Sequence, residues 1–275
     1  MTFLASIPSP PSPFVFHAGA LAPRWYGLLI AIGMMVAITV TRREFRRRGL
    51  PYELVFNLAL WTIPAAVLGA RAYHVITDWR LFSDDPMRVL AISSGGLGLP
   101  GALIGGAIGL LLATRRFGLP MREVLDCIAP GLLCAQIIGR FGNYANQELF
   151  GRPTSLPWGI EIDPVNRPAR FAESPAFHPT FAYEALWNVL VLAFIIRLSG
   201  GFRPRRRAGA IFASYLALYS LGRLVIEQLR SDPASQIAGQ RVNTWTFLTL
   251  LGASLVTLAL LARGPSPLSD RAARS

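Results

Sequence analysis

The sequence contains no lysine, so all 27 of its basic residues are arginines, and it has only three histidines and two cysteines. It has no HExxH motif and no cluster of cysteine and histidine, so no metal site is expected. The GxSxG elbow of serine lipases and the P-loop of ATP-driven pumps are missing as well. We therefore expect neither a metal nor any other cofactor.

The two cysteines are not expected to form a redox pair. Cys127 and Cys134 are predicted to lie in one helix, where their spacing corresponds to roughly 10 Å, too far for an undistorted disulfide. They are interpreted as packing residues. Residues 1–22 have several prolines and no basic residue, so they lack the features of a cleaved signal peptide and are expected to stay attached.

Apolar residues are abundant: they make up 52% of the chain, and the mean hydropathy is +0.42. A membrane-spanning helix needs about 20 mostly apolar residues. Segments of this kind lie near residues 24–42, 53–76, 96–114, 123–143, 180–198, 208–228 and 243–262. The sequence therefore predicts an all-α, multi-pass membrane protein with about seven transmembrane helices, forming one integral-membrane domain over residues 1–275.

The arginines indicate how these spans are oriented. Sixteen follow the first, third, fifth and seventh spans, whereas only seven lie in the opposite loops. Because arginine-rich loops stay in the cytoplasm, the N-terminus is expected outside and the C-terminus inside. The long break at 144–178 then lies outside, and we predict that it is an insertion forming a small extracytoplasmic cap or a substrate contact. The net charge of +12 is spread over short loops, which indicates contact with anionic membrane lipids and argues against nucleic acid.

Small residues mark the third span. Gly101, Gly105 and Gly109 are spaced four apart, which lets neighbouring helices approach closely. The alternative is a flexible segment lining a lipid site, formed by Gly95, Gly96 and Gly98.

Four arginines lie within spans or at their edges: Arg24, Arg71, Arg140 and Arg223. An arginine near the bilayer centre costs about 2.5–3.5 kcal/mol on insertion scales, so each needs a partner or a wet cavity. Arg223 has Glu227 one turn later, a spacing that allows an ion pair on one helix face. This pair is either a simple internal ion pair or part of a functional site.

Arg140 has no acid one turn away, and its nearest local carboxylate is Glu148. The residues around it predict that the helix ends beside a cavity; they are Gly142, Asn143, Asn146 and Gly151. The amides can donate hydrogen bonds, and the glycines permit tight turns. Because arginine binds phosphate through a planar fork of donors, we interpret this segment as a site for the phosphate of an anionic lipid.

The motif HPTFAYE at 178–184 has two interpretations. In the first, His178 caps the start of the fifth span, while Tyr183 and Glu184 anchor that helix at the membrane interface. In the second, these side chains belong to a shared polar pocket.

The stretch GRFGNYANQELFG at 139–151 resembles the signature of the bacterial prolipoprotein diacylglyceryl transferase family, approximately GR-x-GN-x-x-N-x-E-x-x-G, at every specified position. The similarity extends over most of the chain. It includes RWYG at 24–27, GAR at 69–71, GALIGG at 101–106, HPTFAYE at 178–184 and RLVIEQLRSDP at 223–233.

The resemblance implies an enzyme of the bacterial inner membrane with seven spans and its N-terminus outside. Its substrates are phosphatidylglycerol and the lipobox cysteine of a prolipoprotein; the diacylglyceryl group moves to the thiol and glycerol phosphate is released, as the first step of lipoprotein maturation. The resemblance places Arg140, Arg223, Glu227 and Tyr26 on the family's site positions, and we assign these four, together with His178, as catalytic residues. The implied substrate-binding residues are Arg140, Asn143, Asn146, Glu148, Gly151 and Arg223.

One position departs from the family. Enterobacterial members have a histidine proposed as catalytic in an HGGLIG-like run, where this chain has Pro100 in PGALIG. Either that histidine is not the general base throughout the family, or this chain uses another group, or it has lost activity. Candidate acceptors of the thiol proton are His178, Glu148, Glu184 and Glu227, and Tyr26 is placed to orient a phosphate or hydroxyl.

Two other function classes stay open. Pairs of arginine and carboxylate in membrane helices also mark the paths of transporters and lipid flippases, which move substrates without covalent change. A non-catalytic lipid-binding partner is the third class, and Pro100 is its only support.

Overall fold

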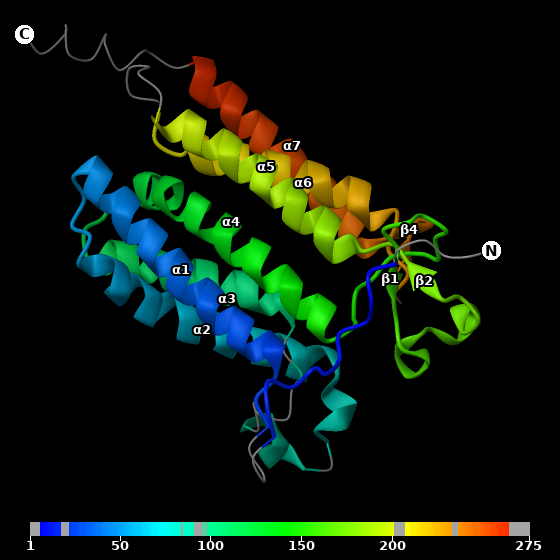
Figure 1. Cartoon of the computed structure of the whole chain (residues 1–275). Helices are drawn as coiled ribbons and strands as arrows, with labels where there is room; N and C mark the ends of the chain where they lie inside the picture. Colours follow the sequence, from blue (N-terminus) through cyan, green and yellow to red (C-terminus); the bar gives the residue numbers. More distant parts are fainter. Residues whose placement is uncertain are drawn as a thin grey trace, which may run out of the picture. The chain divides into compact units, whose positions relative to one another are not determined.

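The computed structural model describes residues 6–17, 22–83, 85–90, 96, 98–200, 207–232 and 236–263. Most of them lie in long helices (Figure 1). These are α1 (Trp25–Arg48), α2 (Leu54–Thr77), α3 (Leu99–Arg116), α4 (Met121–Ala145), α5 (Thr180–Gly200), α6 (Ala210–Glu227) and α7 (Val242–Arg263). All seven predicted spans are therefore confirmed as helices.

Six of these helices are long and apolar enough to cross a membrane. The exception is α3, which has the same length as α6 but ends on two charged residues, Arg115 and Arg116. The helix surfaces carry large apolar side chains that are mostly exposed, such as those of Leu68, Val225 and Leu260. So much exposed apolar surface is unfavourable in water and favourable against lipid chains. The protein is a multi-pass membrane protein.

The chain divides into two compact units, one made of Met1–Thr39 with Ile128–Ser275 and the other of Val40–Cys127. In the second unit, α2 packs along α3 through glycines. A Cβ on Gly109 would lie 2.6 Å from the carbonyl oxygen of Trp61, and one on Gly101 or Gly105 would collide with α2 backbone. The prediction of close helix packing is confirmed.

The alternative role for the glycines before α3 is not tested. Gly96 and Gly98 lie against the rings of His74 and Tyr73, whereas Gly95 lies outside the described residues. Pro100 lies in the first turn of α3, where proline is favoured because its missing N–H has no helical partner to lose.

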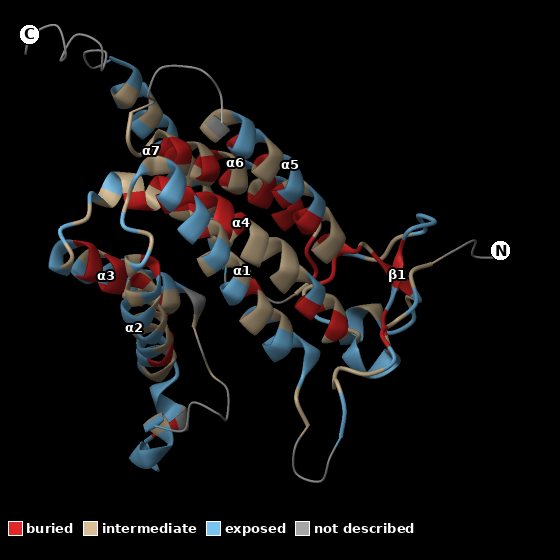
Figure 2. Cartoon of the chain, turned by 60° about the vertical axis from the view of Figure 1, so that its left-hand side comes forward, coloured by how far each residue is buried: buried red, intermediate tan, exposed pale blue. Residues whose placement is uncertain are grey.

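In the first unit, α6 is the central helix. Half of it is buried, compared with 6% of the apolar stretch of α7. It packs against both α5 and α7, and Figure 2 shows buried residues along α4, α5 and α6 of this unit. Their core includes Leu133, Val191, Ile195 and Tyr215. A polar side chain on the buried face of α6 is therefore held rigidly.

Two short antiparallel strand pairs add to the helical fold, and the all-α prediction did not include them. In the 144–178 segment, β1 (Ile160–Glu161) pairs with β2 (Ala176–Phe177). This segment also contains η4 (Pro164–Asn166) and η5 (Ala169–Phe171), and it packs around a small apolar cluster formed by Phe150, Ile160, Ile162 and Phe177. Between α6 and α7, β3 (Gln236–Ile237) pairs with β4 (Gln240–Arg241).

Candidate functional site

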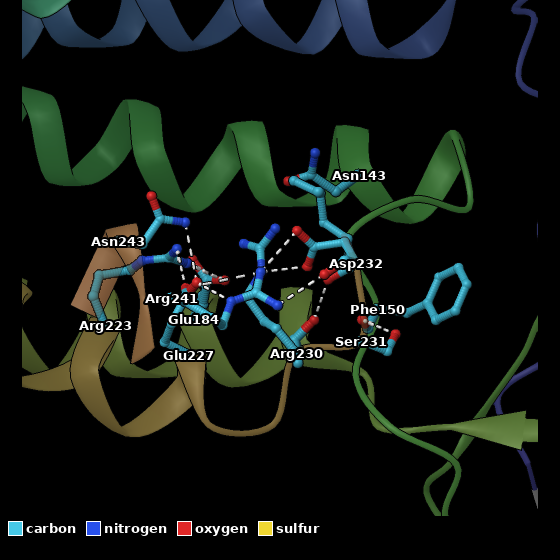
Figure 3. A network of polar contacts seen from close by, with 12 residues as sticks. Asn143, Phe150, Glu184, Arg223, Glu227, Arg230, Ser231, Asp232, Arg241 and Asn243 are labelled. Atoms are coloured by element: carbon cyan, nitrogen blue, oxygen red, sulfur yellow. Dashed lines mark hydrogen bonds and ion pairs between the residues drawn. The ribbon is translucent and has the colours of Figure 1, made fainter. Parts of the chain in front are cut away.

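A network of buried and partly buried charges lies at one end of the helices in the first unit (Figure 3). We call it the ion network; its members are Arg140, Glu184, Arg223, Glu227, Arg230, Asp232 and Arg241. It is built where α4 ends, α5 begins, α6 ends and the chain enters α7. Segments far apart in sequence therefore meet at one polar site.

Glu184 joins the two arginines that the sequence singled out. Its Oε2 lies 2.6 Å from Nη2 of Arg140, and its Oε1 lies 2.6 Å from Nη1 of Arg223. Its side chain is only 3% exposed, because it lies one turn inside α5. The polar-pocket interpretation of this motif is therefore correct for Glu184, and anchoring at the interface is not its role.

Glu227 makes the second junction. Its Oε2 lies 3.1 Å from Nη2 of Arg223, which confirms the ion pair predicted from their spacing. Its Oε1 accepts hydrogen bonds from Nε of Arg241 at 2.7 Å and from Nδ2 of Asn243 at 3.0 Å. The Glu227 side chain is fully buried. Removing one partner of such a buried pair typically costs about 3–5 kcal/mol.

Asp232 completes the network outside the membrane-spanning helices. It accepts from Nε of Arg230 at 2.7 Å and from Nη2 of Arg241 at 2.9 Å. Burial by itself raises the pKa of Asp232, but the hydrogen bond and charge of Arg230, together with Arg241, outweigh it and lower that pKa below its usual value. Asp232 is therefore held as a carboxylate.

Arg223 keeps unused hydrogen-bonding capacity. Among the described residues, neither its Nε nor its Nη1 has an aligned acceptor, although Nη1 lies within ion-pair distance of Glu184. The guanidinium carbon lies 5.1 Å from the centre of the Phe247 ring. Donors that are buried without an aligned acceptor are costly, so an additional acceptor that reached them would be stabilising. Oε2 of Glu184 is likewise buried without an aligned donor.

The end of α4 follows the predicted course, since the helix stops at Ala145. Asn143 accepts from Nη1 of Arg140 at 3.3 Å and donates to Glu148 at 2.9 Å. Asn146 donates more weakly to the same carboxylate, at 3.5 Å. The amides thus link Arg140 to Glu148 without a direct ion pair in the described residues.

The role predicted for the two glycines is wrong. The positive φ angles of this turn belong to Gln147, at 51°, and Leu149, at 57°. The glycines are required for close contact instead: a Cβ on Gly142 would lie 2.6 Å from the ring of Tyr26, and one on Gly151 would lie 2.7 Å from Cβ of His178. Positive φ angles on side-chain-bearing residues store strain, and such strain often occurs at functional sites.

Tyr26 and His178 lie beside this turn. The first turn of α1 places Tyr26 against Gly142, within electrostatic reach of Glu148 and Arg140. Nδ1 of His178 lies 3.2 Å from the hydroxyl of Tyr183, which accepts from Nε1 of Trp158 at 3.0 Å. Burial lowers the pKa of His178, so its imidazole is neutral near pH 7. No hydrogen bond or ion pair between described residues joins His178 to the ion network.

The other two arginines in the spans have partners elsewhere. Arg24 lies over the ring of Phe14, 5.2 Å from its centre. Arg71, in the second unit, donates to the backbone oxygens of Val89 and Gly96 and lies over the ring of Phe82. Neither belongs to the ion network.

Sequence reasoning left several members of the network out of the site. Arg230, Asp232 and Arg241 were not selected, nor was the adjoining Asn243. Glu184 was considered as an interface anchor, as part of a polar pocket and as a proton acceptor, but not as the partner of Arg140 and Arg223. Arg230 and Asp232 lie inside the stretch RLVIEQLRSDP, so the likeness of that stretch to the family was a usable signal. Arg241 and Asn243 had no such signal, because they follow a separate turn.

Known proteins resemble the chain over most of its length. The family described as prolipoprotein diacylglyceryl transferase matches residues 13–260. A phosphatidylglycerol–prolipoprotein diacylglyceryl transferase of Frankia alni is 43% identical over 96% of this chain, which spans 69% of that protein. Proteins of the same name from Nocardia farcinica and Trichormus variabilis are 41% and 38% identical; the chain spans 55% of the first and 95% of the second. The Frankia casuarinae protein is 43% identical, and the chain spans 62% of it.

Proposed function

Because this chain belongs to the prolipoprotein diacylglyceryl transferase family, we propose that it transfers the diacylglyceryl group of phosphatidylglycerol to the lipobox cysteine of a prolipoprotein. The names of its relatives support both substrates. One observation carries the assignment of the site: Arg140 and Arg223, from different helices, each lie 2.6 Å from the same carboxylate of Glu184.

The charge balance of the ion network favours an anionic ligand. Its four arginines face three carboxylates, which leaves one positive charge in excess. An uncompensated charge is costly in a region of low dielectric. A lipid phosphate supplies the missing negative charge, and Arg223 has N–H groups to bind it.

The reaction is a displacement at the glycerol carbon that bears the phosphate. The cysteine sulfur of the prolipoprotein forms a bond to that carbon, the bond from carbon to phosphate oxygen breaks, and the electron pair leaves with glycerol phosphate. The thiol proton passes to a base. Arg140 and Arg223 stabilise the charge that grows on the departing phosphate, which is the role of preorganised donors in many transfer reactions.

The contacts of the candidate residues narrow the choice of the base that accepts the thiol proton. Glu184 and Glu227 have their oxygens engaged by arginines and serve as structural anions. This leaves Glu148, which is exposed and accepts only from amides in the described residues, and His178, whose imidazole is neutral. Tyr26, beside Glu148, orients the phosphate or a glycerol hydroxyl.

The same residues support an orientation of the site in the membrane. Arg140 is near the end of α4, Glu184 near the start of α5 and Glu227 at the end of α6, so the site opens at the ends opposite the arginine-rich loops. By the positive-inside rule this end faces outwards, with the N-terminus outside, the C-terminus in the cytoplasm and the 144–178 insertion as an extracytoplasmic cap. We place the enzyme in the bacterial inner membrane, as one integral-membrane domain over residues 1–275.

Arg140→Ala tests this function. We expect the rate of diacylglyceryl transfer to a lipobox peptide to fall about 100- to 1,000-fold, as when a charge-stabilising donor is removed. Arg140→Lys should also stay well below wild type, because a point charge lacks the two-pronged geometry. The rate is followed by mass spectrometry of the peptide, at matched amounts of folded protein.

Arg197→Ala is the matched control, because it removes an exposed arginine from the last turn of α5, away from the ion network. It should retain the wild-type rate. Near-normal transfer by Arg140→Ala would overturn the phosphate role of Arg140. If the wild-type protein moves lipid without adding a diacylglyceryl group to the peptide, it is a transporter.

A further inference from the structure

A second polar site adjoins the ion network. It is a cavity of about 430 Å³, formed by the insertion, the turn after α6 and the β3–β4 hairpin. Four arginines line it, namely Arg152, Arg170, Arg230 and Arg241. Glu227 also lines it, and the same carboxylate contacts Arg223 on its other oxygen. The cavity and the proposed reaction site therefore share one residue as a wall.

The cavity carries an excess of positive charge. Its four arginines face Glu227 and, through Arg230 and Arg241, Asp232. All three nitrogens of Arg241 are occupied by Glu227 and Asp232. Arg230 uses only Nε in the described contacts, and Arg170 donates through Nη2 to the backbone oxygen of Ser231. Two guanidinium charges are left without a carboxylate among the described residues.

The size and charge of the cavity select its ligand. A volume of about 430 Å³ is near the lower end for small-molecule pockets, and several converging guanidinium groups match the oxygens of a phosphate ester. Its lining is too polar for an acyl chain. A small dianion that carries hydroxyl groups fits both properties.

We propose that this cavity binds a glycerol phosphate group. This inference rests on the proposed function, in which glycerol phosphate leaves carbon at Arg140 and Arg223. The group comes either from the released product or from the head of an incoming phosphatidylglycerol. If the cavity holds the released product, glycerol phosphate moves from Arg223 past Glu227 into the cavity. Product bound there slows the next turnover.

The test measures binding without turnover. The purified full chain, in detergent free of phosphatidylglycerol, is titrated with glycerol phosphate by calorimetry. The double variant Arg152→Gln/Arg170→Gln removes two exposed guanidinium groups of the lining. We expect its affinity to be about tenfold or more below that of wild type, since each bond to a charged donor contributes strongly.

The controls separate this site from general charge and from misfolding. Arg197→Gln removes an exposed charge far from the lining and should keep wild-type affinity, and uncharged glycerol should not bind. The two single variants should each show part of the loss. Equal affinity in wild type and the double variant, or no binding to wild type, overturns the proposal.

Further arms identify the source of the ligand. If added glycerol phosphate inhibits transfer and the double variant relieves that inhibition, the cavity holds the product. If a short-chain phosphatidylglycerol loses affinity in the double variant and free glycerol phosphate has no effect on transfer, the cavity holds the lipid head. If wild type binds glycerol phosphate more tightly than the double variant but transfers nothing, the result supports the cavity and overturns the proposed function. If the protein transfers the diacylglyceryl group but wild type and the double variant bind glycerol phosphate equally, the cavity proposal is overturned and the proposed function stands.

Discussion

The contact between α2 and α3 and the ion network at the ends of α4 to α7 both hold helices together in an apolar protein, and they do so in opposite ways. The α2–α3 contact relies on absent side chains: glycines let the two backbones meet. The ion network instead uses seven charged side chains that come from four segments of the chain.

This difference indicates that the ion network has a role beyond holding helices together. Close backbone contact is inexpensive, because it buries no charge and fixes no long side chain. A network of buried ions has a desolvation cost of several kcal/mol for each ion, and well-packed apolar residues often replace such networks without loss of stability. Helices that can pack through glycine do not need arginines to associate. The ion network is therefore best explained by a ligand.

Replacing Glu184 by Gln should have the largest effect on both stability and transfer. The change removes the charge between Arg140 and Arg223 and keeps the shape of the side chain. We expect a loss of about 3–5 kcal/mol in the free energy of unfolding, because two like charges lose their shared partner. We also expect transfer to fall about 100-fold, because both guanidinium groups lose their positions. Thermal unfolding and transfer to a lipobox peptide are the measurements.

The control is Glu173→Gln, which neutralises an exposed acid in the 144–178 insertion. It should leave both the unfolding temperature and the transfer rate as in wild type. If Glu184→Gln behaves like this control, Glu184 does not organise the site.

Replacing Gly109 by Ala should affect stability and spare the chemistry. The new Cβ would lie 2.6 Å from the carbonyl oxygen of Trp61, so the α2–α3 contact must open, at a cost of about 1–3 kcal/mol. Gly106→Ala is the matched control on the same helix, because its Cβ would be an ordinary 3.5 Å from Cβ of Ala66. Transfer per folded molecule should match wild type in both variants. Equal unfolding temperatures for the two variants would show that the close contact between the α2 and α3 backbones does not contribute to stability.

The smallest expected effect concerns Asp232 and pH. Its pKa is lowered in the folded protein, so the unfolded chain binds a proton more readily in the range below about pH 3.9. Asp232 therefore stabilises the protein above that pH, and this contribution disappears as the pH falls through the lowered pKa. Asp232→Asn should lose about 1 kcal/mol near neutral pH, the scale of a partly exposed ion pair. The difference from wild type should vanish in acid.

Unfolding is measured by denaturant titration across this pH range. The Glu173→Gln protein provides the reference slope. A constant difference between Asp232→Asn and wild type at every pH would contradict the assignment, because it would show that packing and not charge is lost.

Local chemistry was enough to predict the helices and part of the site. Each span is recognised from its own residues, because a bilayer requires about 20 apolar residues in a row. The ion pair of Arg223 with Glu227 and the close packing at Gly109 follow from helical spacing, which places residues four apart on one face. The end of α4 was likewise predicted correctly, although the turn role assigned to its glycines was wrong.

Contacts between distant segments were not accessible in this way. Arg140 meets Glu184 on another helix, and Arg241 reaches Glu227 from beyond a hairpin. Nothing local distinguishes these acids, because an ion pair depends on where two helices are placed and not on their separation along the chain. For the same reason Gly142 and Gly151 were assigned to turns when they in fact make room for Tyr26 and His178. Hydropathy and spacing are properties of one segment, whereas the pairing of buried charges is set by how the segments pack.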